Sequence, residues 1–230
     1  IINGKVEKYK IGSGEVTNFL LLKKVIDTGK PIIISSGMSS LSELDKTVSF
    51  LRFYNANFSI LQCTTSYPTQ PENYGLNVIS ELKERFDVPI GYSDHSAKIS
   101  TGIAAVALGA KIVEFHVVFD REQFGPDVTS SLTITETKGL VKGVNEIAKA
   151  LDHPVDKSDN SAFTGLKQIF EKSLAVNKNL LKGHVLSFED LEAKKPKGYG
   201  IDASDYKSVL GKELTNDMEQ WNFLTQDDIH

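Results

Sequence analysis

The feature that most constrains this chain is a regular alternation, from residue 7 to about residue 152, of short apolar runs and longer amphipathic segments. The runs are rich in Ile and Val and mostly lack apolar–polar alternation, which is typical of strands buried on both faces of a parallel sheet. We expect five of them, over residues 7–13, 31–37, 58–64, 88–94 and 111–117. Repeated strand–helix units predict an α/β fold with a parallel sheet, either open or closed into a barrel.

Two of the expected helices begin with a capping box, in which a hydroxyl and a carboxylate three residues apart satisfy free backbone N–H groups. Ser40 and Glu43 form one box, and Thr133 and Glu136 form the other. The helices are therefore expected to start at about residues 41 and 134.

Polar residues collect at the end of every expected strand. They are Lys10, Ser13, Ser35, Ser36, Thr64, Thr65, Ser93, Asp94, His95, Glu114 and His116. An open sheet concentrates its ligand groups at one switch point, whereas a barrel carries them around its C-terminal face. We therefore predict a TIM-type (β/α)8 barrel of which only about five βα units are present, over residues 1–152.

After residue 152 the strand–helix pattern ends and the sequence pattern changes. Residues 153–165 are polar and rich in turn residues, which is typical of a linker. Residues 166–230 contain short apolar runs broken by Lys-Gly and Gly-Tyr-Gly turns, which predicts a small, mostly β module with a limited core of its own.

Composition excludes several classes of protein. The single cysteine, Cys63, leaves no internal disulfide and fits a reducing cytoplasm, and a net charge of −4 argues against a nucleic-acid binder. No apolar run approaches the ~18 residues of a membrane span. The sequence opens with neither Met nor a signal-peptide pattern, so we expect an N-terminally truncated chain.

His95 and His116 are the strongest candidates for chemistry. They lie 21 residues apart at the ends of consecutive strands, so a parallel βαβ unit would bring both to the same side of the sheet. We call this opening, at the carboxyl ends of the strands, the mouth. Two imidazoles with carboxylates nearby could bind a divalent metal that keeps positions open for substrate. Taken alone, His116 in apolar VEFHVVF is better explained as a satisfied histidine, but the pairing with His95 at matched strand ends favours metal ligation.

Lys10 and Ser13 in YKIGSGE suggest an anion site, because a point charge and hydroxyl or backbone donors bind phosphate together. A Gly-rich turn is the simpler reading of that stretch alone. Hydroxyls at other strand ends favour phosphate binding; they are Ser36, Thr65 and Ser93. Asp127 in FGPD could hydrogen-bond a sugar hydroxyl or stabilise the Gly-Pro turn, and Cys63 fits the core better than a nucleophile.

Five stretches in order, YKIGSGE, KPIIISSGMS, LQCTTSYPTQPE, IGYSDHS and VEFHVVFDREQFGPD, resemble the sialic acid synthase family. Those enzymes condense phosphoenolpyruvate with an N-acetylated hexose such as N-acetylmannosamine, giving a nine-carbon sialic acid and phosphate. The resemblance extends to a C-terminal antifreeze-like domain of the β-clip type. It also implies a domain-swapped homodimer and a divalent metal, Mn2+ or Mg2+.

The resemblance assigns roles residue by residue. His95 and His116 match the family's two metal ligands. Lys10, Ser13, Ser36, Thr65 and Ser93 match positions on the phosphoenolpyruvate side, and Glu15, Tyr67 and Asp127 match positions on the sugar side. Lys195 in AKKPKGYGI stands where the family's antifreeze-like domain offers an Arg to the partner's sugar, and a lysine lacks the bidentate fork of that Arg.

Two other functions remain to be weighed. One is a non-catalytic, truncated paralogue that binds a sugar phosphate or another protein. The other is a different metal-dependent barrel enzyme, such as a pyruvate aldolase, which is disfavoured because no lysine has a convincing Schiff-base setting at a strand end.

Overall fold

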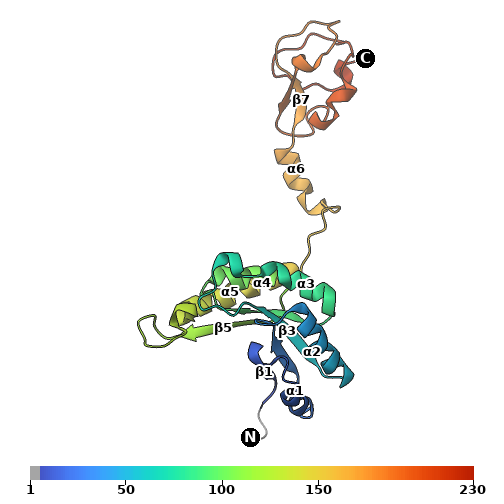
Figure 1. Cartoon of the computed structure of the whole chain (residues 1–230). Helices are drawn as coiled ribbons and strands as arrows, with labels where there is room; N and C mark the ends of the chain where they lie inside the picture. Colours follow the sequence, from blue (N-terminus) through green and yellow to red (C-terminus); the bar gives the residue numbers. More distant parts are fainter. Residues whose placement is uncertain (1–5) are drawn as a thin grey trace. The chain divides into compact units, whose positions relative to one another are not determined.

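The computed structural model describes residues 6–230 and divides the chain into two compact units, one ending at Pro154 and the other spanning Val155–His230 (Figure 1). The division falls inside residues 153–165, the stretch expected to be a linker. Residues 1–5, which the expected barrel part includes, lie outside the described residues.

The first unit is built on a six-stranded, all-parallel sheet. Its strands are β1 Tyr9–Ile11, β2 Ile32–Ser35, β3 Phe58–Cys63, β4 Ile90–Asp94, β5 Val113–Val118 and β6 Ser131–Thr133. They lie side by side in sequence order, each pairing in parallel with the next. A doubly wound open sheet would reverse its strand order at a switch point. The unreversed order is that of a barrel segment, and it confirms the predicted α/β half-barrel.

The sequence analysis missed one strand. β6 has three residues, Ser-Leu-Thr, and pairs with β5 through His116↔Ser131 and Val118↔Thr133. A segment so short carries no hydrophobic pattern of its own, so the five expected strands become six, while within the described residues no α-helix separates β5 from β6.

Five helices separate or follow the strands: α1 Phe19–Ile26, α2 Leu41–Phe53, α3 Leu76–Phe86, α4 Ile99–Ala107 and α5 Ile134–Leu151. Both predicted capping boxes are confirmed, with Ser40 and Thr133 as N-caps. Short 3-10 turns occur at Ser13–Glu15, Pro71–Asn73 and Val128–Ser130.

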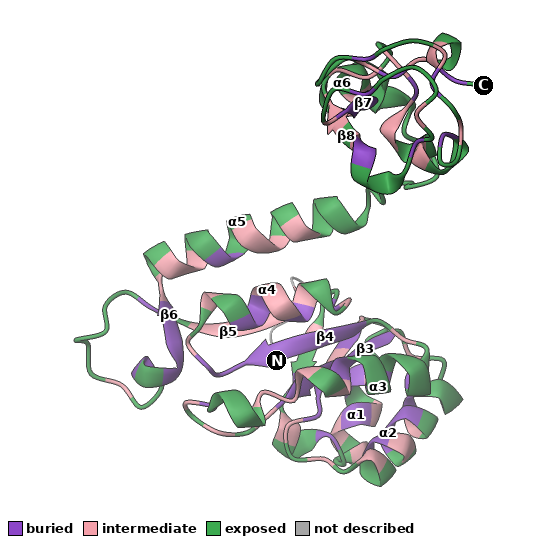
Figure 2. Cartoon of the chain, turned by 90° about the horizontal axis from the view of Figure 1, so that it is seen from above, coloured by how far each residue is buried: buried purple, intermediate pink, exposed green. Residues whose placement is uncertain are grey.

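The hydrophobic core of this unit lies between the sheet and its helices. Sheet residues that face the helices are almost fully buried: Ile32, Ile34, Ile60, Ile90 and Tyr92. They pack with Leu22, Leu44, Leu51, Ile79 and Leu82 of α1, α2 and α3. Figure 2 shows β3 and β4 as the most buried strands, and α4 and α5 as neighbours. Because successive side chains of a strand alternate in direction, the residues between these core positions face away from the helices.

The second unit has a separate core around Leu174, Val176, Leu214 and Leu224. One antiparallel ladder joins β7 Ser173–Val176 to β8 Leu191–Lys194, and isolated bridges add contacts such as Ala175↔Phe223. Before it comes α6 Thr164–Phe170, and the remaining regular structure is 3-10 turns at Ser161–Phe163, Phe188–Asp190, Ala203–Ser208 and Gln226–Asp228.

Across residues 6–230 no helix combines the length and apolarity that crossing a membrane requires.

Candidate functional site

Strand register places the candidate residues on the face that turns away from the helices. Lys10 lies opposite Ile33, Ser93 lies opposite Glu114, and His116 is two residues beyond Glu114 on β5. These positions alternate with the helix-facing core positions. The topology therefore supplies a polar inner face at the carboxyl ends of the strands.

One ion pair shows that the sheet curves. The Lys10 Nζ on β1 lies 3.1 Å from Glu114 Oε1 on β5. In a flat sheet these strands would stand about 19 Å apart, four spacings of ~4.8 Å, which is farther than the two side chains can span. The inner face is concave, and residues from strands distant in the sheet meet across it.

The two histidines lie together at this mouth, as the spacing predicted. Their ring centroids are 5.2 Å apart, in an edge-to-face arrangement. His95 is 6% exposed, and its Nδ1 lies 3.1 Å from the carbonyl oxygen of Thr64. A carbonyl only accepts, so Nδ1 donates and the neutral ring keeps its lone pair on Nε2. Burial lowers the pKa of His95 and favours this neutral form, although the Thr64 contact opposes the shift.

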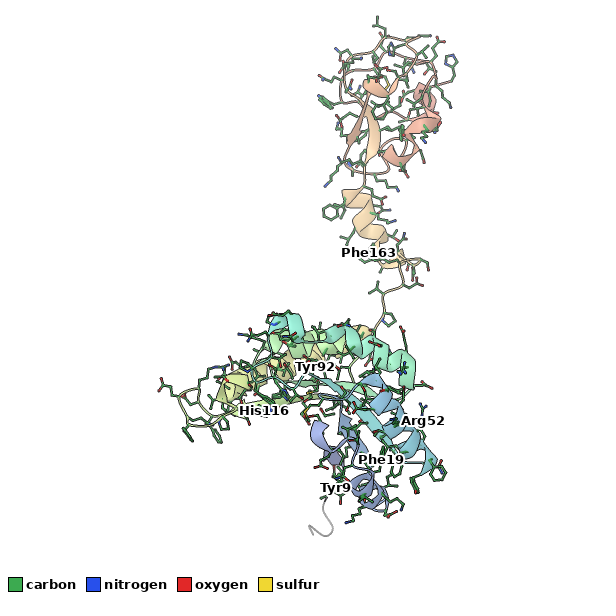
Figure 3. The ribbon with its side chains drawn as sticks, viewed as in Figure 1. Tyr9, Phe19, Arg52, Tyr92, His116 and Phe163 are labelled. Carbon is green, nitrogen blue, oxygen red and sulfur yellow. The ribbon has the colours of Figure 1, made fainter. Side chains whose placement is uncertain are left out.

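His116 lies on β5, three residues after its first residue, Val113, and two residues before its last, Val118. Its Nδ1 is 3.8 Å from Asp127 Oδ2, on the loop that leads to the 3-10 turn Val128–Ser130. Figure 3 labels His116 on β5 and Tyr92 on the neighbouring β4, where Tyr92 lies opposite Val113 in the register.

The donor set fits a metal with open coordination positions. Within residues 6–230 no cluster of three or more His, Cys, Asp and Glu side chains is placed to enclose an ion. Two imidazoles are present, however, and the Thr64 carbonyl fixes the His95 tautomer that can ligate through Nε2. A site of this kind would leave positions for water and substrate.

Tyr67 covers the histidine pair. Its ring stacks on His95 at 4.2 Å between centroids and meets His116 edge-on at 5.8 Å. The side chain is partly open to solvent, and burial, followed by the nearby Cys63, Asp127 and Glu114, raises the pKa of its phenol. The neutral hydroxyl is thus available as a donor to a ligand.

The predicted anion residues also meet at the mouth. Ser13 Oγ lies 3.5 Å from Thr65 Oγ1, and the Ser93 hydroxyl donates to Glu114 Oε1 at 2.8 Å, the same oxygen that pairs with Lys10. Ser93 is thus linked to Lys10 through one carboxylate oxygen, and Ser13 and Thr65 form a second hydroxyl pair from the ends of β1 and β3. Glu15 follows in the turn after Ser13, where its Oε2 accepts from Asn18 Nδ2 at 2.7 Å.

Ser36 is placed away from the inner face, and Lys195 lies outside the first unit. The buried Ser36 hydroxyl donates to Gln62 Oε1 at 3.2 Å, on the helix-facing side of the sheet, and Ser35 takes the inner-face position instead. Lys195 lies in the second unit, where its Nζ is 4.8 Å from the centre of the Phe170 ring. The ligand roles of both residues stay predictions.

Sequence reasoning gave no role to two residues that shape the mouth. Glu114 was recognised as polar at a strand end, but its partners come from β1 and β4. Gly37 allows close approach: a Cβ there would lie 2.4 Å from Thr65 Oγ1 and 3.1 Å from Cys63 Sγ. The glycine in IIISSGMS, directly after a buried strand, was the available signal for that approach.

This fold and this mouth define the class: a barrel-type α/β protein with two histidines and a lysine at the carboxyl ends of its strands. The sequence matches the NeuB family over residues 1–156, and the chain belongs to that family. The predicted resemblance to sialic acid synthases is thereby confirmed.

Named relatives agree with the family. The chain is 37% identical over 215 residues to N,N'-diacetyllegionaminic acid synthase of Campylobacter jejuni and to human N-acetylneuraminate-9-phosphate synthase. Each alignment covers 92% of this chain, but 64% of the first relative and 59% of the second. The chain thus spans less than two thirds of the length of these relatives.

Among solved structures, the N-acetylneuraminic acid synthetase of Leptospira borgpetersenii superposes with a TM-score of 0.65 at 35% identity, over 70% of this chain and 56% of that one. A 3-deoxy-D-arabino-heptulosonate 7-phosphate synthase from Thermotoga maritima, at 20% identity and a TM-score of 0.55, shares the fold.

Proposed function

We propose that this chain carries the reacting mouth of a sugar-acid synthase. The reaction joins C3 of phosphoenolpyruvate to the aldehyde carbon of an open-chain N-acetylated hexose, N-acetylmannosamine or a related sugar. Water adds at C2, and C–O cleavage releases phosphate and leaves a nine-carbon sialic-acid-type product. The observation that carries the proposal is the convergence of Lys10, Ser93, His95 and His116 at one mouth in a member of the NeuB family.

Lys10 and the surrounding hydroxyls hold the phosphate of phosphoenolpyruvate. A lysine supplies a point charge, and the hydroxyls of Ser13, Thr65 and Ser93 supply directed donors within the same mouth. Ser36 also follows β2, but its hydroxyl donates to Gln62 on the helix-facing side of the sheet, so we leave it out of this set. Fixing one reactant in this way removes much of the entropic barrier of a bimolecular reaction.

His95 and His116 hold a divalent metal, Mn2+ or Mg2+, which when bound supplies Lewis-acid polarisation of the sugar aldehyde. Nitrogen ligands favour Mn2+ over Mg2+, because Mg2+ prefers oxygen. The Thr64 carbonyl keeps His95 in the tautomer that this role requires.

The sugar lies against Tyr67, Glu15 and Asp127. The phenol above the histidines and the two exposed carboxylates provide donors and acceptors for sugar hydroxyls. Residues 166–230 form the antifreeze-like domain, which in a domain-swapped homodimer presents Lys195 to the sugar in the partner's mouth.

Phosphate release from phosphoenolpyruvate tests the proposal. The 230-residue chain is assayed with N-acetylmannosamine and Mn2+, and we expect release that requires both sugar and metal and stops on addition of EDTA. His116→Ala should lose at least about a hundredfold in rate, because removing one of two ligands weakens the metal site. Lys142→Ala, on the exposed face of α5, is the control and should retain full activity.

Absence of turnover with any N-acetylated hexose would contradict the proposal. If phosphoenolpyruvate nevertheless bound in a manner that depended on Lys10, the result would support the alternative, a non-catalytic sugar-phosphate-binding module.

A further inference from the structure

Glu114 connects the two halves of the anion side of the mouth. Its Oε1 lies 3.1 Å from Lys10 Nζ and accepts from the Ser93 hydroxyl at 2.8 Å. The three residues come from β5, β1 and β4, so a single carboxylate oxygen joins side chains across the curved sheet. Both partners are groups to which the proposed function assigns phosphate binding.

The position of this carboxylate is unfavourable for the binding of an anion. Within a few ångströms, two like charges repel strongly at the effective dielectric of a protein surface. The Lys10 and Glu114 side chains are 32% and 39% exposed, so solvent weakens this repulsion without removing it. A mouth selected for phosphate affinity alone would not contain Glu114.

Its contacts supply the compensating benefit. The four-carbon stem of a lysine leaves the ammonium free to adopt many positions, and a free serine hydroxyl rotates. Glu114 fixes both, and the pairing with Lys10 spans strands that no backbone hydrogen bond connects.

We infer that Glu114 is a positioning residue that serves as a counter-charge to Lys10. It orients the Lys10 and Ser93 side chains toward the mouth, and its ion pair with Lys10 is replaced by one between Lys10 and the phosphate when the anion binds. This inference rests on the proposed function, because it assumes that Lys10 serves a phosphate group. Glu114 weakens ground-state binding of the anion and, in exchange, orders the groups that the reaction needs.

Two substitutions of Glu114 distinguish its repulsion of the anion from its ordering of Lys10 and Ser93, because they should change phosphate affinity in opposite directions. Glu114→Gln removes the charge and keeps an oxygen that accepts from Ser93, so we expect inorganic phosphate to bind about tenfold more tightly while turnover falls. Glu114→Asp keeps the charge but shortens the reach to Lys10, so phosphate should bind more weakly than in the wild type. Binding is measured by calorimetry on the whole chain at fixed ionic strength.

Asp45→Asn is the matched control. Asp45 pairs with Arg85 on the outer surface at 2.6 Å, with side chains 42% and 43% exposed, so the substitution makes the same change of charge at a similar exposure away from the mouth. Phosphate affinity in this variant should equal that of the wild type, which would show that net charge alone does not explain the effect of Glu114→Gln.

A purely structural role for Glu114 predicts that both substitutions weaken phosphate binding and lower the melting temperature together. That result would overturn the inference, as would a wild-type chain that binds no phosphate. Turnover by the wild type is scored separately: an inactive wild type with opposite affinity changes in the two variants refutes the proposed reaction and leaves the counter-charge role supported.

Discussion

Gly37 offers the sharpest test of how the mouth is packed, through the substitution Gly37→Ala. The added Cβ would lie 2.4 Å from Thr65 Oγ1, 3.1 Å from Cys63 Sγ and 3.3 Å from Ser13 Cβ. Gly37 is not among the positive-φ glycines, so the backbone accepts alanine and the effect is steric. Overpacking of this kind destabilises a fold by about 1–3 kcal/mol.

The substitution should also weaken anion binding. Thr65 Oγ1 must move, and it is the hydroxyl that faces Ser13 Oγ at 3.5 Å. Loss of about one neutral hydrogen bond, ~1 kcal/mol, corresponds to roughly fivefold weaker binding of inorganic phosphate. Unfolding is followed by circular dichroism in urea, and binding is followed by calorimetry.

Gly12→Ala is the matched control, because a Cβ at Gly12 meets nothing within 4 Å and its φ of −65° suits alanine. This variant should be as stable as the wild type or slightly more stable. Thr65→Ala supplies the second control, since it removes the closest clashing atom, and Gly37→Ala should destabilise that background less. Equal effects of Gly37→Ala and Gly12→Ala would refute the steric argument.

Two further predictions concern stability. Thr133→Ala removes the N-cap of α5, whose hydroxyl accepts from the Glu136 N–H, and should lower the free energy of unfolding by about 1 kcal/mol; an unchanged urea midpoint would contradict this. Asp190 is buried, and burial would raise its pKa, but hydrogen bonds from Lys178, His184 and a neighbouring serine hold the pKa well below its usual range. Because the folded pKa is the lower one, the stabilisation is complete above about pH 4 and is lost as the pH falls toward the folded value. Asp190→Asn should therefore destabilise the second unit by about 2–3 kcal/mol at pH 7 and by much less near pH 2. Unfolding is followed by the fluorescence of the single tryptophan. A loss of stability that does not depend on pH would contradict the lowered pKa of Asp190.

The parts of the fold that local sequence determines were predictable. Five strands appeared as apolar runs, and two capping boxes located helix starts to the residue, because both signals depend on neighbours within a few positions. β6 gave no such signal. Its three residues become a strand only because β5 offers a free edge beside them.

The same reasoning explains the outcome for the site. His95 and His116 were predictable as neighbours because parallel strands joined by one helix end at the same edge of a sheet. The face occupied by the Ser36 side chain was not predictable. Neighbouring residues of a strand point to opposite faces, so Ser35 and Ser36 can be told apart only when the position of β2 is known to the residue.

The contact between Lys10 and Glu114 depends on a third level of organisation. Neither the local pattern nor the pairing of neighbouring strands brings β1 to β5; the curvature accumulated over four successive strand pairs does. The charge arrangement of the mouth is thus a property of the curved sheet as a whole. A change that flattened the sheet would separate Lys10 from Glu114 while leaving the His95–His116 pair on its two adjacent strands, so anion binding should be lost before the metal-binding geometry.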